Sequence, residues 1–201
     1  MPLKLCALLA ASLGVGKMPL KGSTKGNKIV IDGDKAYIHM YGGHVAIIDA
    51  EDVDTIKDYT WCFASTVGVM TKSVDNHCRL LSRMILFGEN YEKGGTEIAD
   101  HRNHNLLDNT KVKNDNEGNL RICTWKQNCY NQISRGGTSH YKGVSWSKEK
   151  RMWKTLIKHN YRSIHIGYFK KEEDAARAYD KKARELFGEF AYLNFSERRA
   201  A

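Results

Sequence analysis

The sequence predicts an α+β protein made of many short strands and few helices. Two runs of apolar residues alternate with polar ones and are broken by glycine-rich turns, one over residues 28–71 and one over residues 143–169. The second run leads into an amphipathic segment of helical period. With 41% hydrophobic and 27% charged residues and only 2 prolines, the composition is that of a globular protein.

The first 27 residues are treated as an uncertain N-terminal extension. Lys4 precedes an apolar run over Leu5–Leu13, a weak signal-peptide pattern that lacks a convincing cleavage site. The run is also too short to span a bilayer. The segment beginning at Met18 repeats the first four residues and is a possible second start.

Short strands and turns are predicted between residues 28 and 87. Asp-Gly and Gly-Gly turns separate the first strands, and Asp49 is the expected N-cap of a short helix or turn. The predicted strands are Lys28–Ile31, Ala36–Met40, His44–Ile48 and one or two within Trp61–Thr71; the predicted helices are Asp49–Tyr59 and Leu80–Leu86.

A long polar segment divides the next elements. Residues 88–96 are expected to form a loop, Glu97–His101 a strand, and the Asn-rich stretch up to Asn119 another loop. A short strand over Leu120–Ile122 then leads into a helix over Thr124–Gln132, with Thr124 as N-cap.

The C-terminal segment predicts a compact unit of three strands and one helix. The helix has a stripe of apolar residues facing one side, and Gly188 is its expected C-cap. The strands are Gly143–Trp146, Trp153–His159 and Ile164–Phe169; the helix is Glu172–Phe187; the stripe is Ala175, Tyr179, Ala183 and Leu186.

The positive charge lies almost entirely in the last third of the chain. The formal net charge is +9, but residues 1–131 hold 16 Lys and Arg against 15 Asp and Glu, whereas residues 132–201 hold 16 against 8. Such a balance favours an acidic partner such as nucleic acid, although a solvated basic face gives the same pattern.

The five cysteines do not predict a disulfide framework or a zinc site. Their number is odd, there is no Cys-x-x-Cys pair, and the spacings are too wide for a zinc knuckle. Isolated buried thiols are the better interpretation.

The candidate chemistry lies in Asp100-His101, Asn119-Leu120-Arg121 and Asn128. Neighbouring side chains on a strand point in different directions, so one can hold a metal while the other faces a water. Carboxylate and amide oxygens suit a hard ion such as Mg²⁺, and histidine is the usual general base near neutral pH.

These residues resemble the HNH endonuclease family, in particular its phage and intron-encoded homing branch, whose pattern is Asp-His, Asp-Asn and Asn-Leu-Arg-x-x-Thr-x-x-x-Asn. The resemblance implies a ββα-metal motif in which His101 activates the attacking water. It further implies that Asp100 and Asn128 ligate Mg²⁺ or Mn²⁺, and that Asn119 buttresses the loop and orients the histidine.

The chain departs from the family pattern in two places. Lys111–Gly118 looks like an insertion in the loop, where we expect the fold to tolerate it. Upstream, Leu81-Ser82-Arg83 stands where the family often has Leu-His-Arg, so no histidine role is carried over there.

Residues Tyr141–Phe195 resemble the AP2 domain through Tyr141-Lys-Gly-Val144, Ile166-Gly-Tyr-Phe169 and Glu173-Asp-Ala-Ala-Arg-Ala-Tyr-Asp180. The resemblance implies a three-stranded sheet that lies in the major groove of DNA with a helix packed behind it. Basic, aromatic and small polar side chains interleave in this sheet. The expected DNA contacts are Lys142, Ser145, Trp146, Ser147, Lys148, Lys150, Arg151, Lys154, Lys158, Arg162 and His165.

The sequence therefore predicts a homing-type DNA endonuclease, acting on double-stranded DNA as a monomer or homodimer and giving a nick or a double-strand break. We expect no membrane partner and a cytoplasmic location, in the host cell if the gene is phage-encoded. The expected domains are 28–133 (HNH endonuclease), 134–139 (linker) and 140–196 (AP2-like). The alternative is a DNA-binding regulator with a vestigial nuclease site.

Overall fold

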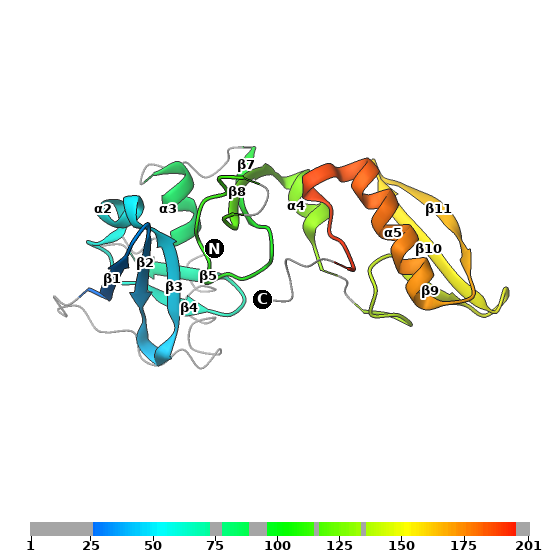
Figure 1. The fold of residues 1–201 in the computed structure, drawn as a ribbon, viewed down its shortest axis with the longest axis horizontal. Coiled ribbons are helices and arrows are strands. Elements are labelled where there is room, and N and C mark those ends of the chain that lie inside the picture. Colours follow the sequence, from blue (N-terminus) through cyan, green and yellow to red (C-terminus); the bar gives the residue numbers. More distant parts are fainter. Residues whose placement is uncertain (1–25, 73–77, 89–95, 115–116, 134–135, 196–201) are drawn as a thin grey trace, which may run out of the picture. The chain divides into compact units, whose positions relative to one another are not determined.

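The computed structural model describes residues 26–72, 78–88, 96–114, 117–133 and 136–195. The chain forms two compact units, Met1–Cys123 and Thr124–Ala201, built from several small sheets and short helices (Figure 1). The predicted mixed α+β class is confirmed. None of the helices within the described residues is long and apolar enough to cross a membrane.

The first sheet is an antiparallel meander of β1 (Lys28–Asp32), β2 (Lys35–His39) and β3 (Val45–Asp49). It confirms the first three predicted strands to within one residue at every end. The period of two places Ala36 and Ile38 on the same face as Ala46 and Ile48, and all four are fully buried. The 3-10 turn η1 (Tyr41–Gly43) joins β2 to β3.

A second small sheet and two helices complete the core of the first unit. Trp61 fills the centre of this core, where its indole Nε1 donates to the backbone oxygen of Ile56 at 3.0 Å. The elements are η2 (Ala50–Asp52), α2 (Val53–Ile56), β4 (Cys62–Ala64), β5 (Gly68–Lys72), β6 (Cys78–Leu80) and α3 (Leu81–Phe87). The strand β6 was not predicted, because three residues are too few to show alternation.

One local prediction in this region is wrong. Asp49 does stand directly before η2, but its side chain makes no capping hydrogen bond. Its carboxylate is buried and binds two lysines of distant segments instead, as described below.

The strands predicted on either side of the Asn-rich loop are β7 (Glu97–His101) and β8 (Leu120–Thr124), and the structure pairs them in a two-stranded sheet. The helix α4 (Trp125–Asn131) follows at once. Thr124 caps it as predicted, with a reciprocal capping box between Thr124 and Gln127. Strand, loop, strand and helix thus follow one another in the order of the predicted ββα motif, whose packing stays a prediction.

The second unit confirms the predicted three strands and helix. Its antiparallel sheet has the order β11 (Arg162–Phe169), β10 (Met152–His159), β9 (Val144–Ser147). The helix α5 (Glu172–Phe187) packs on one face of this sheet (Figure 1). Gly188 ends the helix at a φ of 54°, followed by the turn η3 (Gly188–Phe190). The predicted stripe packs on the sheet, with Leu186 half-buried at its margin.

Several predictions fall wholly or partly outside the described residues. These are the N-terminal extension up to residue 25, the loop over 89–95 and the first two residues of the predicted linker. Of the cysteines, Cys123 is buried as predicted and Cys129 is exposed, against the prediction.

Gly118 closes the loop between β7 and β8 in a conformation that only glycine fits. Its φ is +80°, and a Cβ there would overlap the backbone carbonyl of Lys111. Gly43 has a φ of +79° but open space around it. We expect Gly43→Ala to lower the free energy of unfolding by about 1 kcal/mol and Gly118→Ala by roughly 2–4 kcal/mol.

Urea denaturation of the full chain, followed by circular dichroism, measures both variants. Because the two glycines share nearly the same φ, the difference isolates the overlap with Lys111. Equal losses in the two variants would mean that the loop is not packed against Lys111 as described.

Candidate functional site

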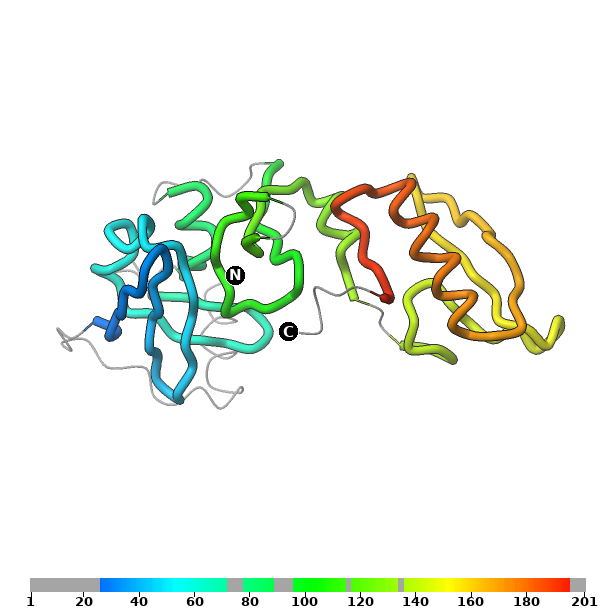
Figure 2. Tube along the Cα trace, in the orientation of Figure 1, coloured from blue at the N-terminus to red at the C-terminus, as the bar shows by residue number. Residues whose placement is uncertain are grey.

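The loop between β7 and β8 is docked on the first sheet as an additional edge segment. Backbone bonds of 2.8 Å join Ile47 N–H to the oxygen of Leu107, and the N–H of Asn109 to the oxygen of Ile47. Asp108 is thereby bridged in parallel to Ile47. Figure 2 shows this loop, in green, curving beside β3. The first sheet is therefore a support for the candidate site.

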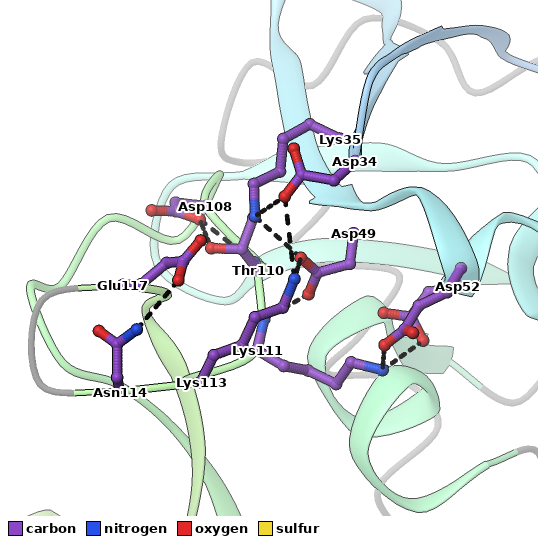
Figure 3. Close-up of polar contacts among 11 residues, drawn as sticks. Asp34, Lys35, Asp49, Asp52, Asp108, Thr110, Lys111, Lys113, Asn114 and Glu117 are labelled. Atoms are coloured by element: carbon purple, nitrogen blue, oxygen red, sulfur yellow. Dashed lines mark hydrogen bonds and ion pairs between the residues drawn. The ribbon is translucent and has the colours of Figure 1, made fainter.

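A buried carboxylate secures the same junction (Figure 3). Asp49 is 1% exposed, and its two oxygens accept from the Lys35 ammonium at 2.9 Å and the Lys111 backbone N–H at 2.7 Å. Burial alone would raise the pKa of Asp49, but these bonds outweigh it and hold the pKa below its ordinary value. Lys113 lies 3.4 Å from the same carboxylate.

The segment predicted to be an insertion, Lys111–Gly118, thus begins with an anchor. The ammonium of Lys111 binds Glu51 at 2.6 Å and Asp52 at 3.0 Å, in addition to the backbone bond to Asp49. The segment is therefore attached to the first sheet at its start. The prediction that the fold tolerates this insertion does not extend to Lys111.

Within the described parts of the chain, one acidic group has spacing that could hold a cation: Asp49, Glu51 and Asp52, with ligand atoms within 4.8 Å of one another. Lys35 and Lys111 already bind these carboxylates. The group acts as an ion-pair network that fixes the loop, and it is not the metal site that the sequence predicts.

The asparagines of the loop shape its backbone. Asn103 and Asn105 each accept a hydrogen bond from the backbone N–H two residues further on, at 2.8 and 3.1 Å. Asp108 does the same for Thr110. Such successive turns explain why this loop is rich in asparagine.

Asn119 lies at the centre of the loop, 2% exposed. Its Oδ1 accepts from the Asn103 N–H at 2.8 Å, and its Nδ2 donates to the backbone oxygens of Asn105 and Asp108 at 3.0 and 2.8 Å. All these contacts are with the loop backbone, and it is Asn109 that contacts the His101 ring. The predicted catalytic role of Asn119 stays a prediction.

His101 ends β7 and is half-buried. Its Nε2 lies 3.1 Å from Oδ1 of Asn109, a residue 1% exposed. Burial lowers the pKa of His101 below its ordinary value, and the contacts with Asn109 and Asp100 partly offset this effect. The sequence contained Asp108-Asn109 as part of the family pattern but gave no reason to assign Asn109 this contact.

Asp100 is buried and paired with a buried arginine from the opposite strand. Arg121 donates from Nε and Nη2 to Oδ2 of Asp100 at 2.9 and 2.8 Å. A fixed carboxylate beside a histidine, without thiolate, is a donor set that accepts hard divalent ions. By residue type these donors fit Mg²⁺ or Mn²⁺, and an ion bound at Asp100 would share that carboxylate with Arg121.

Asn128, the other predicted metal ligand, is half-buried on α4 in the second unit. This helix packs within that unit: the Tyr130 ring stacks on Phe187 at 3.9 Å between centroids. The Lys142 ammonium donates to the backbone oxygens of Tyr130 and Gln132, both at 2.7 Å. Lys142, predicted to contact DNA, is thus engaged with the end of α4.

The sheet of the second unit has a face that α5 does not cover. Val144, Thr155 and Ile157 are buried and define the covered side. Residues paired across antiparallel strands share a face, so Ser145, Lys154 and Tyr168 form one row on the opposite side. Leu156–His165, Lys158–Ser163 and Ser147–Met152 are the other pairs on this open face.

The structure brings five of the predicted DNA contacts together on this open face: Ser145, Ser147, Lys154, Lys158 and His165. The exposed residues Lys148, Lys150 and Arg151 lie at its end, on the turn between β9 and β10, and Arg162 is exposed at the start of β11. Trp146 points to the side of Trp153, with a ring contact at 5.2 Å, and is 40% exposed.

The Asp100–Arg121 pair makes a testable contribution to stability. Removing one partner leaves the other charge buried without its counter-ion, so Arg121→Leu should lower the free energy of unfolding by about 3–5 kcal/mol. The double variant Asp100→Leu with Arg121→Leu should recover most of that loss. Urea denaturation of all four proteins in the cycle measures the coupling; additive losses would mean that the pair is not coupled.

No protein-family model matches the chain. Over 96 residues it is 37% identical to an uncharacterized HNH endonuclease of Acanthamoeba polyphaga mimivirus, which covers 48% of this chain and 46% of that protein. Over 84 residues it is 38% identical to Protein 3.8 of Escherichia phage T7, covering 39% of this chain and 64% of that protein. The chain thus spans about half of the length of the first relative and less than two-thirds of the length of the second. It is a distant homologue of a protein named as an HNH endonuclease.

Proposed function

We propose that the chain is a homing-type, metal-dependent DNA endonuclease of the HNH type. The observation that carries this proposal is the half-buried His101, held by the buried amide of Asn109 next to the buried carboxylate of Asp100. The similarity to a protein named as an HNH endonuclease supports it.

In the proposed reaction, His101 takes a proton from a water molecule that attacks the phosphorus of the DNA backbone in line. Asp100, fixed by Arg121, is the proposed ligand of Mg²⁺ or Mn²⁺ in the first unit, and Asn128 is the proposed ligand on α4. The bound ion supplies stabilisation of negative charge on the phosphate and on the leaving 3′ oxygen. The products are ends with a 5′-phosphate and a 3′-hydroxyl.

We further propose that the second unit is AP2-like and binds double-stranded DNA with the open face of its sheet. Divided at the boundary between the two units, residues 1–123 hold 15 Lys and Arg against 15 Asp and Glu, and residues 124–201 hold 17 against 8. The whole net charge of +9 therefore belongs to the unit with the open face. A β-sheet face with lysines can enter the major groove and neutralise phosphates.

Cleavage of supercoiled plasmid that carries a candidate site tests the enzymatic proposal. With Mg²⁺ or Mn²⁺ the wild type should nick it, and His101→Ala should be slower by about 10²–10⁴-fold, because the general base is lost. His39→Ala, which changes an exposed histidine of β2, is the matched control and should keep its activity. A metal chelator should stop cleavage in all active variants.

If the wild type cleaves no DNA, its native locus included, the enzymatic proposal fails. A protein that binds DNA without cutting it would then be the DNA-binding regulator. Equal rates for wild type and His101→Ala would remove the proposed role of His101 alone.

Salt dependence of DNA binding tests the proposed interface. Replacing Lys154 and Lys158 by Gln should make the plot of log K for DNA binding against log salt less steep, by about 0.9 for each lost phosphate contact. Replacing Lys181 and Lys182 on α5 by Gln removes the same charge from outside the open face and should change the slope much less. Equal changes for the two pairs would place DNA elsewhere.

A further inference from the structure

The hairpin between β10 and β11 turns through only two residues. His159 pairs with Arg162, so Asn160 and Tyr161 form the whole loop. Their φ angles are +50° and +63°, the pair of left-handed values that a type I′ turn requires. Asparagine suits the first of these positions, but glycine is the residue that normally fills the second. Tyrosine therefore stands where its side chain costs the fold conformational energy.

The Tyr161 ring is fully exposed at this turn. Burial of the ring within the described parts of the chain therefore does not offset the cost of its backbone conformation. An Asn-Gly turn would connect the same two strands without that cost. Because the fold does not require a tyrosine here, the residue indicates a contact with a partner.

The charges around the turn favour an anionic partner. Lys158 and Arg162 flank it, and both are exposed. No acidic residue lies anywhere from Lys150 to Lys171. Lys158 and Ser163 are also the pair of the open face that lies nearest to the turn. The turn is thus one end of the surface that we propose to bind DNA.

The length of the hairpin carries this end beyond the major groove. The eight residues of β10 extend over roughly 26 Å at a rise of about 3.3 Å per residue. The major groove is only about 12 Å wide, and it curves around the duplex. A strand of this length with its middle in the groove therefore meets the sugar–phosphate backbone at its end.

We propose that Tyr161 is a DNA-contacting residue whose ring packs on the apolar deoxyribose surface of the strand that borders the groove, beside phosphates bound by Lys158 and Arg162. This inference rests on the proposed DNA binding by the open face. The contact buries apolar surface and so adds affinity without adding charge. The short turn fixes the backbone of the residue before DNA binds, which lowers the entropic cost of the contact. A contact with sugar positions the protein on the duplex without reading its sequence.

Binding of the full chain to a fluorescein-labelled duplex of mixed sequence tests this contact, with a chelator present to prevent cleavage. Tyr161→Gly removes the ring and relieves the turn, and it should weaken binding by roughly 10-fold. It should leave the slope of log K against log salt unchanged and should raise the urea midpoint of unfolding. Tyr161→Phe keeps the ring and should bind like the wild type. Tyr41→Gly removes an exposed ring from the turn η1 of the first unit and should not change DNA binding.

Weaker binding by a variant that is more stable than the wild type supports the contact, because damage to the fold cannot explain it. Equal binding by the wild type and Tyr161→Gly overturns the proposal, as does Tyr161→Phe binding as weakly as Tyr161→Gly. A lower unfolding midpoint of Tyr161→Gly also overturns it, since tyrosine would then stabilise the turn itself.

The variants of Lys154 and Lys158 separate this inference from the proposed function on which it rests. If they change the salt slope while Tyr161→Gly binds normally, DNA binding by the open face stands and the contact of Tyr161 fails. A wild type that binds no duplex refutes both.

Discussion

The candidate site depends on the pairing of the loop after His101 with the edge of β3. The backbone of Ile47 donates one hydrogen bond to this loop and accepts another from it. Two residues further along β3, the buried carboxylate of Asp49 accepts a hydrogen bond from the Lys111 N–H. A loop that made these bonds only with water would have no fixed path. Because the chain is held at Ile47, Asn109 faces His101 at a defined distance, and the first sheet becomes part of the site without contributing a reactive group.

The polar groups around this junction compensate for one another. Asp49 is nearly without exposure, and a carboxylate in that position would be costly without the lysines that bind it. The same reasoning applies to Asp100, whose charge is matched by Arg121 from the neighbouring strand. In both cases the ion pair fixes a backbone segment on which the site depends, and this explains why charged side chains are buried in a small unit.

Local signals made most of the fold predictable. Alternating apolar residues identified β1, β2 and β3, Thr124 as N-cap identified the start of α4, and a single apolar stripe with a following glycine identified α5. The short β6 gave no such signal. In the site, the sequence indicated His101 and Asp100 because the two residues are adjacent in a family pattern. It assigned to Asn119 the support of the loop and the orientation of the histidine; Asn119 does bind the loop backbone, while the contact of Asn109 with the His101 ring had no signal in the sequence.

The sequence alone determined the order of the elements, the segregation of positive charge into the C-terminal part and the candidate base, because these depend on residue type and near neighbours. The tertiary structure decided which residues support that base, and it assigned Lys142 to the end of α4. The physical reason is distance along the chain. The bond from Lys111 to Asp49 joins residues 62 positions apart, and no local pattern encodes which distant carboxylate, carbonyl or strand edge a polar group will meet once the chain has folded.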